Sequence, residues 1–353
     1  MVVNLVNTLP RTRFQPFLCT SRFEGQLSSG VRADVGRLCL QRRHRLDMAA
    51  ILRFSRMLDE IGVDIVHAHS TSLFLALAAR ALNRRIRIVW HDHYGPPAGL
   101  QRNRWVYGLA ARRTDAIIAV SEKLVDWMRY QLHVSEDRVR YIPNFVCRPA
   151  RPASQVSLPG ERGSRIVCVA GIRNEKDVGG LIQAMEAIAA RAPRAHLLLV
   201  GPIHDPVYWG SIQDQIARRN MGNRVTWLGE RDDIPDILAG CDIGVLSSRS
   251  EGFPVVLLEY GLAGLAVVTT DVGQCSEVID HGKAGILVPS ENATALADAL
   301  LSTLLSTETR QHLGAALARR VDETYAAETV LERVADIYME VLHDHSHRTE
   351  RLM

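Results

Sequence analysis

Short runs of β-branched and aliphatic residues alternate with amphipathic stretches of helical spacing along nearly the whole chain of 353 residues. This alternation is typical of βα units around a parallel sheet. It stops at residues 146–164, where Pro, Gly, Ser and Arg dominate and no periodicity remains. We therefore predict an α/β protein of two Rossmann-like, doubly wound domains at 1–145 and 165–320, joined by a linker at 146–164 and followed by a C-terminal helix and polar tail at 321–353.

The individual elements follow from the same periodicities. The predicted strands are Pro16–Thr20, Asp64–Ala68, Ile86–Trp90, Ala116–Val120, Arg165–Ala170, Ala195–Val200, Arg224–Leu228, Ile243–Ser247 and Ala266–Thr270. The predicted helices are Met48–Ile61, Ser72–Leu82, Gln101–Arg112, Ser121–Leu132, 178–191, 208–220, 254–263, 292–304 and a last helical stretch from about Thr307 to His343. Ligands of such folds bind where strand carboxyl ends and helix amino ends converge, so we expect a site in a cleft between the domains.

The first residues depart from this plan. Val2, Leu5, Val6 and Leu9 have helical spacing, whereas a Rossmann-like half opens with a strand and a glycine-rich turn. Neither occurs here, so we expect either that both lie upstream of Met1, which we favour, or that the chain has lost part of its site. In either case the first sheet should be narrowed or gapped.

The composition excludes several classes of protein. Hydrophobic residues at 47%, charged residues at 23% and a mean hydropathy of -0.02 are ordinary for a soluble globular chain. No apolar run reaches the ~18 residues of a membrane span, and the N-terminus does not read as a signal peptide. The six cysteines are widely spread without a Cys-x-x-Cys pair, which disfavours a zinc site or disulfide framework. We predict a cytoplasmic protein.

Charge is distributed unevenly along the chain. Residues 1–150 hold 23 Lys and Arg against 12 Asp and Glu, so the first half is basic and the second acidic. A basic cluster in the first half consists of Arg42, Arg43, His44, Arg45, Arg53 and Arg56. It suggests a face that docks on the anionic inner surface of a membrane, and a merely solvated arginine-rich face is an equally good interpretation.

The segment from Ser247 to Glu259 reads as the end of a strand, a loop and a helix. Pro254 suits the first helical position, so the free N–H groups of Val255 and Val256 would form an anion site, with phosphate as the usual occupant. Glu251 and Glu259 flank this site, and carboxylates accept paired hydroxyl hydrogen bonds well. A ligand that carries a diphosphate between two sugar-like rings would fit an anion site flanked by two carboxylates. The alternative is that Glu251 caps the helix and Glu259 is solvated, which the apolar neighbours of Glu259 disfavour.

A second segment, Val169 to Asp177, also follows a strand and precedes a helix. Arg173 and Lys176 are cations at a helix start, where the helix dipole disfavours positive charge, so they need an anionic partner. A donor phosphate would serve. The alternative is a surface salt bridge with Glu175 or Asp177, which for this segment alone is the safer interpretation.

These segments carry a resemblance to a known family. SEGFPVVLLE has the Glu-x7-Glu spacing, and residues 247–289 closely resemble the donor-binding half of the retaining family 4 glycosyltransferases with GT-B fold. GIRNEK resembles their Arg-x-x-Lys diphosphate clamp, while DIVHAHS, SEKLVDWM and VRYIPNFV resemble segments of their first domain and linker entry. The resemblance runs from Met1 to about Leu304.

The resemblance implies a hexosyl-type glycosyltransferase that moves a sugar from a nucleotide diphosphate-sugar to a glycan or lipid-linked saccharide, with retention, in cell-surface polysaccharide biosynthesis. It assigns the donor ribose to Glu259 and the transferred sugar to Glu251. Arg173 and Lys176 would stabilise the leaving diphosphate as charge develops on it. The backbone of the loop and helix start would help: Gly252, Phe253, Val255 and Val256, with Pro254 lacking an N–H. Such enzymes need no protein nucleophile, because a donor phosphate oxygen is thought to take the acceptor proton.

A histidine after a first-domain strand contacts the transferred sugar in that family. His91 aligns best and His93 is the near alternative. His-x-His without a third ligand elsewhere is a weak metal signal, and the chain has no Asp-x-Asp, so we predict neither a metal nor another cofactor. Nothing suggests nucleic acid as a partner. Asn144-Phe145 stands where the family has Asn-Gly, which puts the hinge conformation there in question.

Two other functions are compatible with these residues. The first is a catalytically impaired donor-binding subunit of a polysaccharide assembly complex, which the missing first strand makes conceivable. The second is a sugar-nucleotide epimerase of the same fold, for which we find no catalytic carboxylates.

Overall fold

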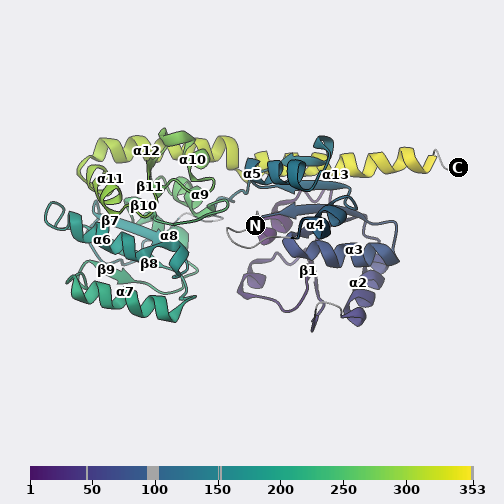
Figure 1. Ribbon diagram of the computed structural model, residues 1–353, viewed down its shortest axis with the longest axis horizontal. Coiled ribbons are helices and arrows are strands. Elements are labelled where there is room, and N and C mark those ends of the chain that lie inside the picture. Colours follow the sequence, from purple (N-terminus) through teal and green to yellow (C-terminus); the bar gives the residue numbers. More distant parts are fainter. Residues whose placement is uncertain (45–46, 94–102, 150, 152, 351–353) are drawn as a thin grey trace. The chain divides into compact units, whose positions relative to one another are not determined.

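The computed structural model describes residues 1–44, 47–93, 103–149, 151 and 153–350, and the chain divides into two compact units. Unit 1 comprises Met1–Phe145 together with Ala327–Met353, and unit 2 comprises Val146–Ala326. The expected linker thus belongs to unit 2, and the C-terminal helix that follows unit 2 in the sequence belongs to unit 1. All strand pairings within the described sheets are parallel, as the βα alternation predicts, and each unit is Rossmann-like (Figure 1).

The strands of unit 1 form two sheets. β1 (Phe17–Thr20) pairs with β2 (Gly36–Cys39), and a separate sheet has the order β3-β4-β5-β6, formed by Ile65–His69, Arg87–Asp92, Ala116–Ala119 and Val139–Tyr141. Within the described ranges, no ladder joins the two sheets. The gap that the sequence predicted in the first domain is therefore present.

The helices of unit 1 begin and end where local sequence signals place them. In α2, for example, Asp47 caps the first turn by accepting from Ala50 N–H, and Gly62 ends the helix in the left-handed region at φ 72°. The helical segments are α1 (Val2–Thr8), η1 (Gln26–Gly30), α2 (Met48–Ile61), η2 (Ser70–Ser72), α3 (Leu73–Leu82), α4 (Arg104–Ala111), α5 (Glu122–Asp126), η3 (Trp127–Gln131), η4 (Glu136–Arg138) and α13 (Ala327–Glu350). Residues 101–102 of the expected helix Gln101–Arg112 lie outside the described residues.

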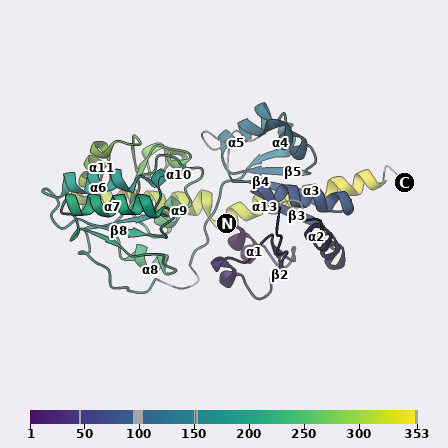
Figure 2. The ribbon, with the colours of Figure 1, turned by 60° about the horizontal axis from the view of Figure 1, so that its bottom comes forward.

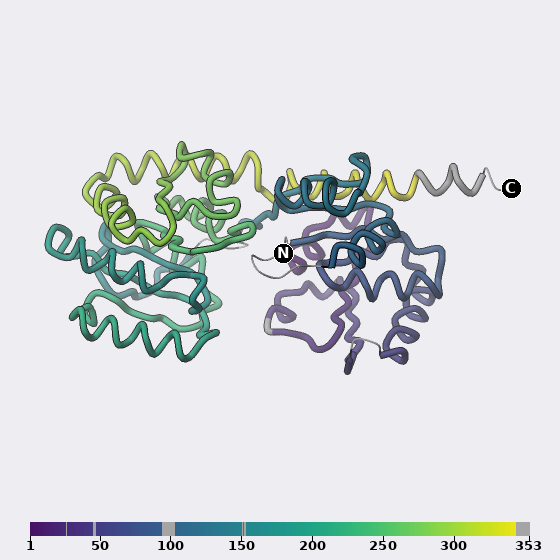
Figure 3. The backbone as a smooth tube through the Cα atoms, in the orientation of Figure 1, coloured from purple at the N-terminus to yellow at the C-terminus, as the bar shows by residue number. Residues whose placement is uncertain are grey.

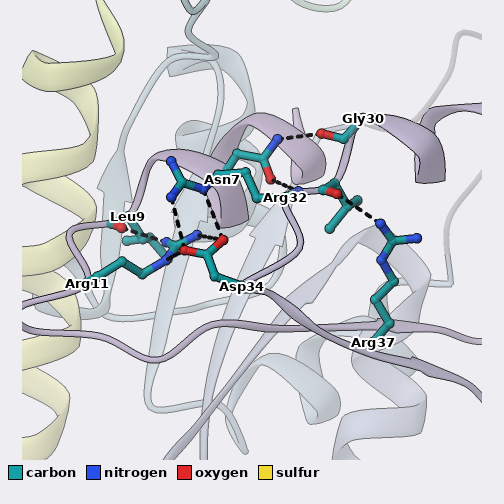
Figure 4. Close-up of polar contacts among 8 residues, drawn as sticks. Asn7, Leu9, Arg11, Gly30, Arg32, Asp34 and Arg37 are labelled. Atoms are coloured by element: carbon teal, nitrogen blue, oxygen red, sulfur yellow. Dashed lines mark hydrogen bonds and ion pairs between the residues drawn. The ribbon is translucent and has the colours of Figure 1, made fainter.

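A polar network holds α1 against the segment between β1 and β2 (Figure 4). Asn7 donates to Gly30 O at 2.7 Å and accepts from Arg32 N–H at 2.9 Å, while Arg11 and Arg32 both pair with Asp34. α1 also packs against α13, so both ends of the chain contribute to unit 1 (Figure 2).

Unit 2 is a six-stranded sheet with helices on both faces. Its strand order is β12-β11-β10-β7-β8-β9, from Ile286–Val288, Ala266–Thr270, Ile243–Leu246, Arg165–Val169, His196–Val200 and Val225–Trp227. The helical segments are η5 (Asn174–Lys176), α6 (Val178–Ile188), α7 (Pro206–Arg218), α8 (Ile234–Ala239), α9 (Val255–Leu262), α10 (Cys275–Val278), η6 (Asp280–Gly282), α11 (Ala293–Leu305), α12 (Thr307–Arg320) and η7 (Val321–Tyr325). Alternate strand residues pack on α6, α7 and α11 to form the main core.

The sequence located most of the strands. Every predicted strand is present within two residues at each end, but the short strands β2, β6 and β12 were not predicted. The last predicted helical stretch is interrupted at Ala326, whose ψ of 146° is not helical, and the chain continues from there into α13 (Figure 3). Within the described residues, no helix is long and apolar enough to cross a membrane.

Gly244 on β10 allows helix α9 to pack closely against the sheet of unit 2. A Cβ at this position would lie only 2.4 Å from Cδ2 of Tyr260, a fully buried residue of α9. The missing side chain therefore determines how deeply α9 packs. We expect Gly244→Ala to lower the free energy of unfolding by about 1–3 kcal/mol, the usual cost of overpacking, in chemical denaturation followed by circular dichroism.

Gly210→Ala is the matched control. This glycine lies inside α7, and no atom lies within 4 Å of a Cβ built on it. Alanine is the better helix former, so this variant should gain about 0.5–1 kcal/mol. A loss at Gly210 as large as that at Gly244 would show that close packing of Tyr260 is not the cause.

Candidate active site

The sheet of unit 2 opens between its two central strands. β10 and β7 pair only at Ile243↔Ile166 and Gly244↔Val167. β8 and β9 continue from β7 on one side, whereas β11 and β12 continue from β10 on the other. This is a topological switch point, and ligands of open α/β sheets bind outside the strand carboxyl ends there.

The hydroxyl of Tyr260 fills the space where these strands diverge. It accepts a hydrogen bond from Val169 N–H at 2.9 Å and lies 3.3 Å from the carbonyl oxygens of both Val167 and Val245, to which it donates. α9 is therefore fixed to the carboxyl ends of both central strands.

The two sequence motifs meet at this point. The loop after β7 carries Arg173 and Lys176, and the loop after β10 carries Glu251. Ser247 Oγ donates to Lys176 O at 2.9 Å, and the guanidinium of Arg249 donates to Asn174 Oδ1 and Asp177 Oδ1 at 2.8 and 2.9 Å. The contacts between them make the two loops one rigid surface beside the switch point.

Lys176 and Glu251 form an ion pair. Lys176 Nζ lies 2.5 Å from Glu251 Oε1, to which Ser248 Oγ also donates at 2.6 Å, and the two charged side chains are only 14% and 11% exposed. The pairing of Lys176 with Glu175 or Asp177, the alternative offered by the sequence, is therefore wrong. The true partner comes from the other motif, 75 residues further along the chain.

Arg173 lies in the same loop but is more exposed. Its Nε is 3.9 Å from Glu175 Oε2, with both side chains at least half exposed. Within the described residues no ion pair joins Arg173 to Glu251 or Glu259. The structure thus brings Lys176 and Glu251 into contact, whereas Arg173 forms the surface ion pair with Glu175 that the alternative interpretation expected.

Glu259 is a half-buried carboxyl group on α9. Its side chain has no hydrogen bond or ion pair to any described residue, and burial raises the pKa of the carboxyl group above its usual value. A half-buried acid without a protein partner is suited to accept hydrogen bonds from a ligand.

The start of α9 lies between the two glutamates. The helix begins at Val255, with Pro254 just before it rather than in its first turn, and no side chain caps it. Gly252 is exposed, Phe253 and Pro254 are buried, and Val255 and Val256 are partly exposed. Val255 N–H already donates to Phe253 O at 3.1 Å, so of the two N–H groups that the sequence predicted to be free, Val256 N–H is the one placed to meet an anion.

A neighbouring turn that the sequence did not single out supports the Glu251 loop. Gln274 N–H donates to Gly252 O at 3.1 Å, and Gly273 has φ 58° with its Cα close to Glu251 O. Any side chain there would meet the loop backbone. A glycine after a strand, as in DVGQC, was the available signal.

In unit 1, four histidines gather at the carboxyl ends of β3 and β4. His67 and His69 lie on β3, His91 lies on β4 and His93 follows it, with His69 opposite His91 in the ladder. Their rings stack, with centroids 4.2–5.2 Å apart. The sequence identified His91 and His93 but not His67 and His69, although a His-x-His near the carboxyl end of each of two consecutive strands was a usable signal.

Burial lowers the pKa of all four imidazoles, to about 3 for His67 and about 4 for His93, so they are neutral at physiological pH. His67 Nε2 lies 3.1 Å from His91 Nδ1, and His69 Nδ1 lies 2.8 Å from His93 Nε2. The nearest ring nitrogens thus already share hydrogen bonds.

The ring nitrogens of His67, His69 and His91 lie within 4.8 Å of one another, so the third metal ligand that the sequence lacked is present. Tetrahedral zinc would require nitrogens about 3.4 Å apart. A hydrogen bond already joins ring nitrogens of His67 and His91, so the arrangement fits a hydrogen-bonded network better than a metal centre. The absence of a required metal stays a prediction.

Comparisons with known proteins identify the family. A model described as "Glycosyltransferase Family 4" matches residues 1–147, and one described as "Glycosyl transferases group 1" matches residues 163–306. The chain is 30% identical over 266 residues to alpha-maltose-1-phosphate synthase of Mycolicibacterium smegmatis, covering 69% of this chain and 67% of that protein. The chain therefore belongs to the family 4 glycosyltransferases and is a transferase enzyme.

Two further comparisons agree with this assignment. N-acetyl-alpha-D-glucosaminyl L-malate synthase of Bacillus anthracis is 26% identical over 313 residues, covering 84% of this chain and 80% of that protein. HepE of Anabaena, solved in complex with UDP and glucose, superposes with a TM-score of 0.80 at 20% identity, covering 96% and 95% of the two chains. The fold is GT-B, as the sequence resemblance implies.

We expect Glu259→Gln to change how stability depends on pH. Because burial raises the pKa of Glu259, the folded chain retains its proton above about pH 4.3, where an unfolded glutamate releases it. Stability contributed by this group is therefore lost as the pH rises from that value through the folded pKa. Urea unfolding at a series of pH values should show wild type losing stability relative to Glu259→Gln over this range.

Glu230→Gln, on an exposed loop of unit 2, serves as the control and should give a curve parallel to wild type. Parallel curves for wild type and Glu259→Gln would contradict a carboxyl group whose ionisation is opposed by burial.

Proposed function

We propose that this enzyme transfers a hexosyl-type sugar, with retention, from a nucleoside diphosphate-sugar to a glycan or lipid-linked saccharide in cell-surface polysaccharide biosynthesis. Its curated relatives are glycosyltransferases of polysaccharide or glycoconjugate biosynthesis. The observation that carries the proposal is the arrangement around α9. An unpaired, half-buried carboxyl group, a helix start and a lysine–glutamate pair lie around one switch point.

Each part of the donor has a counterpart in this arrangement. Glu259 accepts hydrogen bonds from the ribose hydroxyls, and the N–H groups at the start of α9 receive the diphosphate. Lys176 stabilises the charge that develops on the leaving diphosphate, assisted by Arg173, whose exposed side chain would exchange its 3.9 Å contact with Glu175 for the phosphate. Glu251, held by Lys176 and Ser248, accepts from hydroxyls of the transferred sugar.

The chemistry of transfer follows from these roles. The bond between the sugar and the diphosphate breaks as the acceptor oxygen attacks on the same face, and a phosphate oxygen of the donor takes the acceptor proton. The protein supplies no nucleophile. Lys176 and Arg173 do at the diphosphate what a metal ion does in other transferases, so the proposed reaction requires no cofactor. His91 contacts the transferred sugar, with His93 as the neighbouring alternative.

We also propose that the enzyme works in the cytoplasm, at the inner face of a membrane. Helix α2 exposes Met48 and Leu52 beside the exposed Arg53 and Arg56. Apolar residues among cations on one helix suit binding to an anionic lipid surface. Of the remaining cluster, Arg43 and His44 are exposed, Arg42 is partly buried, and Arg45 lies outside the described residues.

Lys176→Ala should weaken binding of a nucleoside diphosphate-sugar about 10- to 100-fold, because a charge-assisted hydrogen bond to phosphate contributes about 1.5–3 kcal/mol. Binding of the free nucleoside should hardly change. Glu259→Gln should weaken both ligands, since the nucleoside retains the ribose. Isothermal calorimetry with UDP-glucose, UDP and uridine, and the same series with guanosine, separates the two effects.

Lys283→Ala is the matched control, because Lys283 is an exposed lysine of unit 2 that pairs with Asp280. It should leave all affinities unchanged. Equal losses for nucleoside and nucleotide sugar in Lys176→Ala would contradict the diphosphate role. Tight donor binding without transfer to any acceptor would favour an impaired donor-binding subunit.

Replacing Arg43, Arg53 and Arg56 by Glu should reduce co-sedimentation with vesicles containing anionic phospholipid, and wild-type binding should fall as salt is added. A control variant with Glu at Arg191, Arg194 and Arg218 reverses three exposed charges of unit 2 and should bind as wild type does. Wild-type binding that is absent, or that salt does not affect, would leave the basic cluster as a solvated face.

A further inference from the structure

A hydrogen-bonded chain connects the C-terminal helix to the proposed sugar-contacting histidine. The hydroxyl of Tyr338, on α13, lies 2.5 Å from His67 Nδ1, and His67 Nε2 lies 3.1 Å from His91 Nδ1. Tyr338 and His91 are only 5% and 3% exposed. Phe14 packs edge-on against the Tyr338 ring with centroids 5.5 Å apart, which holds the hydroxyl in place.

Protons can be arranged along this chain in only two ways if both hydrogen bonds are kept, because a neutral imidazole carries one N–H. In the first, Tyr338 donates to His67 Nδ1, His67 Nε2–H donates to His91 Nδ1, and His91 carries its proton on Nε2. In the second, every bond is reversed, so His67 donates to the Tyr338 oxygen and His91 carries its proton on Nδ1.

The two arrangements leave different numbers of groups without a partner. His91 Nε2 is buried and has no partner among the described residues in either case. In the reversed arrangement the Tyr338 hydroxyl hydrogen lacks an acceptor, since His67 is its one hydrogen-bond partner among the described residues, and the lone pair of His91 Nε2 lacks a donor. The reversed arrangement thus leaves two buried groups unmet instead of one, and the extra group disfavours it on the order of tenfold.

We propose that Tyr338, acting through His67, holds His91 in the tautomer that carries its proton on Nε2, so that His91 offers a hydrogen-bond donor to an oxygen of the transferred sugar. Tyr338 and His67 are positioning residues in this scheme. The proposal rests on the sugar contact of His91 described under the proposed function. It adds that His91 donates to the sugar and does not serve as a base.

The surroundings keep His91 in its neutral form. Burial lowers the pKa of His67 and His91, and the stacked rings of His69 and His93 oppose a further positive charge. The Nε2–H of His91 is a buried donor without a partner among the described residues, so it can donate a hydrogen bond to an oxygen of a ligand. The other two rings, His69 and His93, are hydrogen-bonded to each other and do not compete for the hydrogen bonds between Tyr338, His67 and His91.

Tyr338→Phe removes one hydroxyl and leaves the ring packing intact. Without that hydroxyl, both arrangements leave one donor and one acceptor unmet, so neither is favoured. The tautomer ratio of His91 should move from about ten to one toward about one to one. Nitrogen NMR of the ¹⁵N-histidine-labelled full chain measures this ratio, because protonated and unprotonated ring nitrogens have distinct shifts, and His91→Gln assigns the signals.

Three variants make the test selective. Tyr130→Phe, an exposed tyrosine of the same unit, should leave the ratio unchanged. His67→Gln keeps an amide N–H to donate to His91 Nδ1 and should preserve the Nε2–H form, whereas His67→Leu should lose the preference. Finding the His91 proton on Nδ1 in wild type, or an unchanged ratio in Tyr338→Phe, would overturn the proposal.

Transfer kinetics separate this proposal from the proposed function. Halving the population of the competent tautomer should lower kcat/KM about twofold in Tyr338→Phe, with full activity in Tyr130→Phe and activity restored by Gln rather than Leu at His67. A tautomer shift without any change in kcat/KM would show that Tyr338 sets the tautomer of His91 through His67. It would contradict the proposal that His91 donates a hydrogen bond to the sugar. Absence of transfer in wild type would count against the function and not against the tautomer.

Discussion

The candidate donor site depends on the packing of one aromatic ring against one glycine. Tyr260 lies where a side chain on Gly244 would be, and its hydroxyl bonds to the backbone of both central strands where they separate. A hydroxyl placed there satisfies backbone groups that would otherwise be buried without a partner. The same contact fixes the depth and rotation of α9, and Glu259 is the residue immediately before Tyr260.

The charged groups of the site follow from this placement. With α9 fixed, the loop that precedes it holds Glu251 against Lys176, and Arg249 binds the two loops to each other. Removing the charges of this ion pair from water costs free energy. In return, the pair keeps Lys176 next to the position of the proposed donor phosphate. In the proposed function, the site is therefore preorganised for the donor diphosphate before the donor binds.

Much of this could be predicted from the sequence, because strand, loop and helix start follow one another locally in each motif. Lys176 and Glu251 were found as single residues, yet their mutual contact was not, because sequence neighbours offered Lys176 nearer carboxylates. His67 and His69 were missed because their relation to His91 exists only across the β3–β4 ladder. Tyr338 could not be found, since nothing local indicates that a helix after unit 2 returns to unit 1.

Because the C-terminal helix belongs to unit 1, the order of synthesis of the chain affects when each unit can fold. Unit 1 is composed of the first 145 residues and of a helix that begins at Ala327, so its parts leave the ribosome far apart in time. Unit 2 is one continuous segment, so all its residues have been synthesised before those of unit 1 are complete. The histidines at the ends of β3 and β4 thus lack the hydrogen bond to Tyr338 until the residues that follow unit 2 have been translated. Unit 1 can be completed only after all of unit 2 has been synthesised.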